Sequence, residues 1–212
     1  MLAEIEALAG REEIPIVHWE TGRFLAVLVR ALRPQRVLEV GTAIGYSTVH
    51  MAEELEGGQI VTVELDPQRA AQAREFFAQA GLDDRISLIE GEAREVIAGL
   101  DGPFDLVFLD AKKRQTRDYL RLLEPKVREG SALVVDNMLL SGELALGEDD
   151  GGRWSARTRR FMRELGADLL VSERWLGALV PVGDGLGIAT RRAGPVAEAQ
   201  ADADALTRRV AK

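Results

Sequence analysis

The sequence predicts an α/β fold in which helices cover both faces of a parallel sheet that ends in antiparallel strands. Short apolar runs alternate with helix-like patterns from residue 36 to residue 136, and such alternation is typical of parallel sheets. The run at 104–110 is continuously apolar in its middle, as expected of a strand buried on both faces. After residue 168 the strand-like runs follow one another at hairpin spacing, which predicts antiparallel pairing.

Two amphipathic helices are expected first, at 1–13 and 20–32, and Pro34 follows the end of the second. The alternating part begins after Pro34. Its expected strands are 36–40, 59–64, 85–90, 104–110 and 131–136, and its expected helices are 46–55, 67–80, 93–100 and 115–124. Asp66 is a candidate N-cap, because Pro67 follows it at the first helical position.

The pattern changes after Asn137. A polar, glycine-rich loop is expected at 141–153, either a connector or a lid, and a helix at 155–166. Strands are expected at 168–175, 177–182 and 186–191. The tail at 193–212 is expected to be a helix or a loose end.

The composition argues against several classes of protein for this chain. A chain of 212 residues suits a single domain, 1–212, and it has no cysteine for disulfides, thiolate zinc sites or nucleophiles. No apolar run approaches the roughly 20 residues of a membrane span. The acidic N-terminal stretch is unlike a targeting signal, so we expect a cytoplasmic location. The net charge of −8 disfavours a broad nucleic-acid surface but leaves a local RNA site open.

The turn after the first strand carries a small-residue pattern, with Gly41, Ala43 and Gly45 following Glu39. A tight turn of this kind at a helix start suits a nucleotide-type ligand, although ordinary connections also contain glycines. The dinucleotide fingerprint G-x-G-x-x-G is not met. Glu64 lies 23 residues after Gly41, where a carboxylate can take both hydroxyls of a ribose; a solvated strand end is the alternative.

Ligands of open parallel sheets bind beyond the carboxyl ends of the strands, and acidic residues gather there. Asp110, Asp136 and Asn137 end neighbouring strands and offer oxygen ligands, which suit a divalent cation such as Mg²⁺, Mn²⁺ or Ca²⁺; turn formation is the alternative for the last two. Lys113 is placed to accept a proton from an acceptor hydroxyl, or is a solvated lysine beside Lys112.

The two histidines carry weaker expectations. His18 is placed to border a ligand cleft, and His50 is expected in packing or at the surface. The sequence has neither a serine-centred nucleophile elbow nor a P-loop lysine.

Five segments carry a resemblance to a known family: VLEVGTAIGYST, VELDPQRAAQAR, GLDDRISLIEGEA, FDLVFLDAKK and VVDNMLLSG. In this order and spacing they resemble the cation-dependent group of class I S-adenosylmethionine-dependent O-methyltransferases, which includes catechol and caffeoyl-CoA O-methyltransferases and bacterial relatives. The resemblance extends from about Val17 to about Arg191. It implies a Rossmann-like sheet of seven strands with an antiparallel last strand, N-terminal helices (1–33) over the site, and a homodimer.

The resemblance also implies roles for individual residues. Ser47 would meet the methionine carboxylate, Glu64 the ribose, and Asp110 both the metal and the methionine amino group. Asp136 and Asn137 would complete the metal ligands, and Lys113 matches the catalytic lysine. The positions that match S-adenosylmethionine contacts are Val17, Glu39, Gly41, Ser47, Glu64, Gly91, Glu92, Ala93 and Asp110.

Three departures from the family pattern stand out. Lys112 replaces an acid that often precedes the lysine, and Thr116 replaces a tyrosine, although Tyr119 matches a later one. Glu92 replaces the aspartate of a G-D-A motif. The first two lie at the mouth of the acceptor site and bear on substrate choice.

The expected function is metal-dependent O-methylation of a small acceptor with neighbouring oxygens, such as a catechol. One alternative is methylation of a tRNA hydroxyuridine, which the arginines at 114, 117, 153 and 157 leave open. A nicotinamide dehydrogenase is another alternative, which the missing second glycine and the antiparallel end of the sheet disfavour. A non-catalytic S-adenosylmethionine-binding module is the last, which the intact metal and lysine positions disfavour.

Overall fold

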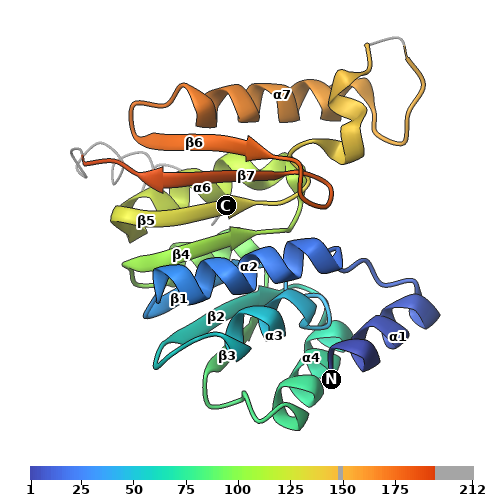
Figure 1. Ribbon diagram of the computed structural model, residues 1–212, viewed down its shortest axis with the longest axis vertical. Coiled ribbons are helices and arrows are strands. Elements are labelled where there is room, and N and C mark those ends of the chain that lie inside the picture. The colour runs from blue at the N-terminus through green and yellow to red at the C-terminus, as the bar shows by residue number, and fades with distance from the viewer. Residues whose placement is uncertain (148–149, 194–212) are drawn as a thin grey trace.

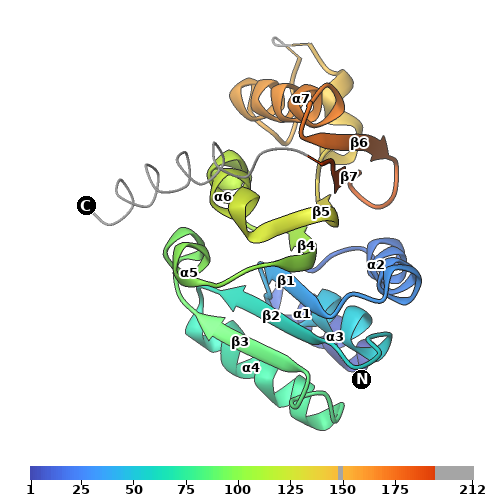
Figure 2. The ribbon, with the colours of Figure 1, turned by 90° about the vertical axis from the view of Figure 1, so that its left-hand side faces the viewer.

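The computed structural model describes residues 1–147 and 150–193, and within them a mixed sheet lies between two layers of helices (Figures 1 and 2). The strands are β1 Arg36–Val40, β2 Gln59–Glu64, β3 Ile86–Glu90, β4 Phe104–Leu109, β5 Val127–Val135, β6 Trp175–Val180 and β7 Leu186–Arg191. The α-helices are α1 Leu2–Glu12, α2 Trp19–Leu32, α3 Tyr46–Glu53, α4 Pro67–Gln79, α5 Ala93–Gly99, α6 Thr116–Leu123 and α7 Ala156–Leu170. Short 3₁₀ turns occupy Lys113–Gln115, Glu124–Lys126 and Leu140–Ala145.

The sheet has seven strands in the order β3-β2-β1-β4-β5-β7-β6. The first five run parallel, and β7 pairs antiparallel with both β5 and β6. The chain order reverses between β1 and β4, which is where ligands bind in open α/β sheets. The predicted α/β class, the parallel alternation and the antiparallel end are therefore confirmed.

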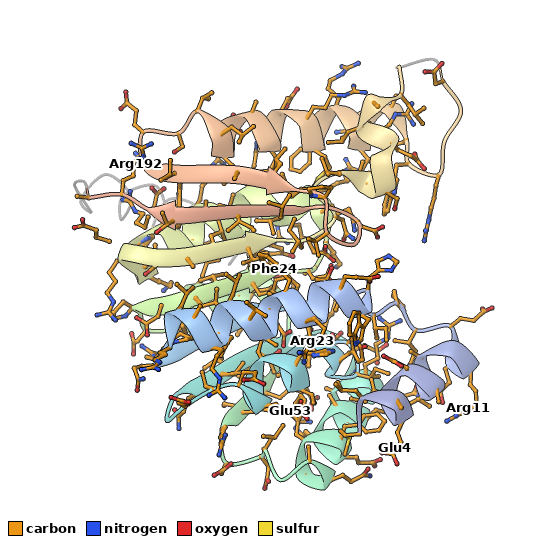
Figure 3. All side chains as sticks on the ribbon, in the orientation of Figure 1. Glu4, Arg11, Arg23, Phe24, Glu53 and Arg192 are labelled. Atoms are coloured by element: carbon orange, nitrogen blue, oxygen red, sulfur yellow. The ribbon has the colours of Figure 1, made fainter. Side chains whose placement is uncertain are left out.

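Two apolar cores form on the two faces of the sheet. Helices α1 to α4 contribute residues such as Leu25, Val49 and Phe77 to one core. Helices α5 to α7 contribute residues such as Tyr119 and Met162 to the other. Side chains fill the space between helices and sheet in Figure 3, and the labelled charged residues are all exposed: Glu4, Arg11, Arg23, Glu53 and Arg192.

Local signals in the sequence explain several helix starts. Asp66 caps α4, because its side chain accepts from the backbone N–H groups of Gln68 and Arg69, and Pro67 takes the first helical position. Ser155 caps α7 in the same way through Thr158 N. The four N-terminal N–H groups of a helix need partners of this kind, and these side chains supply them.

One strand prediction is wrong. Residues 168–175 do not form a strand, since α7 continues to Leu170 and the first strand of the antiparallel pair begins at Trp175. Leu165 and Leu169 are buried at helical spacing, so packing extends the helix through an apolar run that also suits a strand. The expected tail at 193–212 lies outside the described residues, apart from residue 193. Among the described helices, none has the length and apolar character needed to span a membrane.

Candidate functional site

A cavity of about 800 Å³ opens at the carboxyl ends of the central strands, at the point where the chain order reverses. In Figure 1, α1 and the segment before α7 lie at the edge toward which the arrowheads of β4 and β5 point. All the predicted site residues line this cavity except Glu39. They are Val17, Gly41, Ser47, Glu64, Gly91, Glu92, Ala93, Asp110, Lys113, Asp136 and Asn137. His18 also lines it, as expected, whereas His50 is buried against Tyr46.

Glu39 lies behind the cavity wall. Its carboxyl group is fully buried and accepts hydrogen bonds from Ser47 Oγ at 2.5 Å, from Thr62 Oγ1 at 2.6 Å and from Thr48. Burial raises the pKa of Glu39 to about 7, although the three hydroxyl donors oppose the rise. Glu39 therefore reaches the cavity through Ser47, and its predicted part in holding the cofactor stays a prediction.

Glu64 lies at the end of β2 and is fixed by backbone donors. One carboxylate oxygen accepts from Ala43 N at 2.7 Å, and the other accepts from Leu65 N and Asp66 N, both at 2.9 Å. A carboxylate has about four acceptor positions, so roughly one remains for a ligand hydroxyl. Because all three donors are backbone groups, Glu64 is held rigidly between two turns.

Gly41 brings the turn after β1 against the end of β4. Its φ is +103°, and a Cβ atom there would lie 2.1 Å from the backbone oxygen of Asp110. Only glycine allows both this left-handed conformation and this close approach. The turn after β1 and the backbone of Asp110 are therefore packed directly against each other.

Asp110 and Asp136 stand side by side at the ends of β4 and β5. Burial raises the pKa of both carboxyl groups, the charge of Asp110 raises that of Asp136 further, and Lys113 opposes the rise at Asp110. Asp136 Oδ1 is buried and has no hydrogen-bond partner among the described residues. A buried and a half-buried carboxylate with an unsatisfied oxygen fit a bound cation, which would offset both charges.

Asn137 supplies the third oxygen of this set. Within the described residues, no group of three or more His, Cys, Asp or Glu side chains is arranged to hold a metal ion. A divalent cation here therefore requires the Asn137 carboxamide together with the two aspartates. Two carboxylates and one amide oxygen suit a hard cation and leave positions for water or an acceptor.

Asp184 is a site residue that the sequence analysis missed. It lies in the turn between β6 and β7, lines the cavity and accepts from Asn137 Nδ2 at 3.2 Å and from Ser141 Oγ. Its other neighbour is His18, whose Nε2 lies 3.4 Å from Asp184 Oδ1. The signal was an acid between two glycines in a turn that leads into the antiparallel last strand.

Glu92 lines the cavity and is also the N-cap residue of α5. Its carboxylate caps α5 by accepting from Arg94 N at 2.8 Å and Glu95 N at 3.3 Å. Asp and Glu both serve as acceptors at helix starts, so this departure from the family pattern keeps the cap.

The segment before α7 forms the outer wall of the cavity. Arg153 and Trp154 line it, and the Lys113 ammonium lies 4.7 Å from the centre of the Trp154 ring. Glu143 accepts from the backbone N–H groups of Arg153 and Trp154. Buried Arg159 donates to the carbonyls of Gly147 and Asp150, each at 2.9 Å. The described part of the predicted 141–153 loop is thus tied to the domain.

Comparisons with known proteins agree with this geometry. The family model described as O-methyltransferase matches residues 3–192. A catechol O-methyltransferase from Mycobacterium tuberculosis is 36% identical over 168 residues, which cover 77% of this chain and 76% of that protein.

Two solved structures share the fold and part of the sequence. A putative O-methyltransferase from Klebsiella pneumoniae is 32% identical with a TM-score of 0.78, over 91% of this chain and 90% of that one. An O-methyltransferase from Bacillus cereus in complex with SAH is 27% identical with a TM-score of 0.78, over 90% of each chain.

Proposed function

Because this chain belongs to the O-methyltransferase family, we propose that it methylates a hydroxyl group of a catechol-like acceptor with the help of a divalent cation. Family membership makes the enzyme an S-adenosylmethionine-dependent O-methyltransferase of the catechol O-methyltransferase type. The observation that carries the proposal is the pair of aspartates, half-buried Asp110 and buried Asp136, beside Asn137 at the ends of β4 and β5. The expected homodimer and cytoplasmic location remain predictions.

S-adenosylmethionine is proposed to occupy the side of the cavity formed by β1 and β2. Helix α3 begins at Tyr46 without a side-chain cap, so its first N–H groups are available for the methionine carboxylate beside Ser47. The remaining acceptor position of Glu64 would take a ribose hydroxyl. Gly91, Glu92 and Ala93 would border the base, because they follow β3 at the same edge.

The metal is proposed to bind Asp110, Asp136 and Asn137. A divalent cation held there would supply Lewis acidity: it would bind two neighbouring acceptor oxygens and lower the pKa of the hydroxyl among them. The residues themselves would fix the place of that acceptor, because Asp136 is buried, Asp110 is half-buried, and the two follow adjacent strands. Asn137 contributes an oxygen without a third negative charge.

Lys113 is proposed to receive the proton of the acceptor hydroxyl. It lines the cavity three residues after Asp110 and acts electrostatically on that carboxyl group. Its ammonium lies 4.7 Å from the centre of the Trp154 ring, so the side chain extends along the wall of the cavity. In its neutral form the amine would accept the proton while the acceptor oxygen attacks the methyl group.

The test is a methyl-transfer assay on the purified chain with S-adenosylmethionine, catechol or bulk tRNA, followed by mass spectrometry. We expect methylated catechol, loss of at least about 90% of the activity in excess EDTA, and recovery with Mg²⁺. Asp136→Asn should behave like EDTA treatment. Exposed Asp101→Asn should leave the rate unchanged, because it removes the same charge outside the cavity.

Three results would contradict parts of the proposal. Full activity in EDTA would remove the metal role. Undiminished kcat in Lys113→Ala would remove the base assignment. Methylation of tRNA without methylation of catechol would move the acceptor to RNA.

A further inference from the structure

Basic side chains gather at the mouth of the cavity of an otherwise acidic protein. The chain carries a net charge of −8, yet Lys112, Lys113 and Arg153 all line the cavity near Trp154. Arg114 joins Lys112 and Lys113 around a shallow hollow on the outer side of Trp154. We call Lys112, Lys113, Arg114 and Arg153 the basic mouth.

Within the described residues, no carboxylate lies within ion-pair distance of any member of the basic mouth. The Lys113 ammonium and the Arg153 guanidinium lie 4.7 and 5.8 Å from the centre of the Trp154 ring, and the Lys113 charge also acts on Asp110. Some arginines elsewhere on the surface are paired. Arg30 pairs with Glu54 and Glu56, and Arg117 pairs with Glu164 and Asp168. Unpaired cations held close together repel one another, so an anionic ligand would stabilise the basic mouth.

The cavity thus has two ends of opposite charge. Its floor holds Asp110, Asp136 and Asp184, and its mouth holds the cations and an aromatic ring. An acceptor whose hydroxyls reach the floor extends its far side toward Trp154. Aromatic stacking and cation contacts there suit a flat ring with an acidic substituent.

We propose that the natural acceptor is a catechol that carries an acidic group, such as a carboxylate, on the side of the ring away from its hydroxyls, and that Lys112 and Arg153 select it. This inference rests on the proposed function, because it assumes that the hydroxyls lie at the aspartates. Lys112 and Arg153 are specificity residues here, and Lys113 keeps its role at the hydroxyl.

Matched acceptors test the selection. The substrates are 3,4-dihydroxybenzoate and its methyl ester, which differ chiefly in the negative charge. We expect the anion to be favoured by at least about fivefold in kcat/KM at low salt. Lys112→Gln and Arg153→Gln should each lower this preference by about two- to fivefold, because each should reduce kcat/KM for the anion more than for the ester. Exposed Arg121→Gln, outside the cavity, is the matched control and should keep the wild-type preference.

A binding measurement tests the same selection without turnover. Quenching of tryptophan fluorescence reports binding of 3,4-dimethoxybenzoate and of its methyl ester, which have no hydroxyl to methylate. We expect tighter binding of the acid, and we expect 0.5 M NaCl or the Lys112→Gln, Arg153→Gln double variant to remove the difference.

The outcomes separate the two proposals. Equal kcat/KM for acid and ester, or a preference that the double variant keeps, would overturn the inference and leave catechol methylation standing. If neither catechol is methylated, the proposed function fails, and the fluorescence comparison still decides whether the basic mouth binds acids. Methylation of tRNA alone would overturn both.

Discussion

The side-chain amide of Asn137 donates to Asp184 across 3.2 Å, from the end of β5 to the turn between β6 and β7. An amide that donates from its nitrogen keeps its oxygen free for another partner, and Asp136 and Asp110 line the same cavity. Asp184 is therefore a positioning residue for the proposed metal ligand. Groups that orient metal ligands in this way strongly affect metal affinity.

Asp184→Ala should weaken metal binding more than it slows the loaded enzyme. We expect the Mg²⁺ concentration for half-maximal methyl transfer to rise by about 10- to 100-fold, with a smaller change in kcat. Binding of Mn²⁺, followed directly by electron paramagnetic resonance, should weaken in parallel. Ser141→Ala removes another contact to Asp184 but keeps the Asn137 bond, so it is the control. Equal effects of the two variants would argue against positioning.

Glu39 should make the stability of the fold depend on pH. Burial raises its folded-state pKa from 4.5 to about 7, so the folded protein holds this proton more tightly than the unfolded chain does. Stability from this group is fully present below pH 4.5 and is lost as the pH rises to about 7. Compared with Glu39→Gln, the wild type should lose up to about 3 kcal/mol across that window.

Urea unfolding of the two proteins at several pH values measures this difference. Glu39→Gln keeps the shape of the side chain and removes the ionisation. A constant difference from pH 4 to pH 8 would show that Glu39 titrates as an ordinary carboxyl group.

Gly41→Ala should destabilise the fold severely. The added Cβ would lie 2.1 Å from Asp110 O, at a φ of +103° that L-residues rarely adopt. We expect a loss of more than about 3 kcal/mol in the free energy of unfolding, because the clash is with backbone.

Gly57→Ala is a matched control for this change. Gly57 also has a positive φ, +76°, but a Cβ there meets nothing within 4 Å. Gly57→Ala should lower the free energy of unfolding by only about 1–2 kcal/mol, which is the cost of placing an L-residue in the left-handed conformation. Similar losses in the two variants would mean that the contact with Asp110 relaxes easily.

Arg159→Met should make the segment before α7, which contains Trp154, more mobile. Arg159 is only 2% exposed, and its guanidinium donates to the carbonyls of Gly147, Asp150 and Trp154. Methionine fills much of the volume but donates nothing, so those carbonyls lose their partner. We expect faster hydrogen exchange in residues 140–155 and about a threefold or greater rise in KM for the acceptor. Exposed Arg157→Gln should change neither, and protection equal to wild type in Arg159→Met would contradict this role.

The elements with strong local signals could be predicted from sequence. Strand β2 lies at the predicted residues, 59–64, and α4 starts where Asp66 and Pro67 indicate a cap. The end of α7 could not be predicted, since Leu169, Leu170 and Val171 suit a strand as well as a helix. Burial of Leu165 and Leu169 against the sheet decides in favour of the helix, and that is a tertiary effect.

In the site, too, some residues could be placed from the sequence and others could not. Parallel strands deliver their carboxyl ends to one edge, so the order of strands alone brings Asp110 and Asp136 together. To predict that Asp184 lies at the site, one would also need the antiparallel register of β7 against β5. The pairing of Val135 with Gly187 sets the last turn beside Asp136, and nothing near Asp184 in sequence reveals that register. Glu39 could be located from its motif, but the motif does not reveal that its side chain is buried and does not line the cavity.

The late position of β6 and β7 has a consequence for how the enzyme is made. Asp110 and Asp136 leave the ribosome well before the hairpin that carries Asp184 and covers the edge of β5. A nascent chain that stops before Trp175 therefore exposes an unpaired strand edge and has no support for Asn137. The support for Asn137 therefore forms only once the hairpin has been made and has paired with β5.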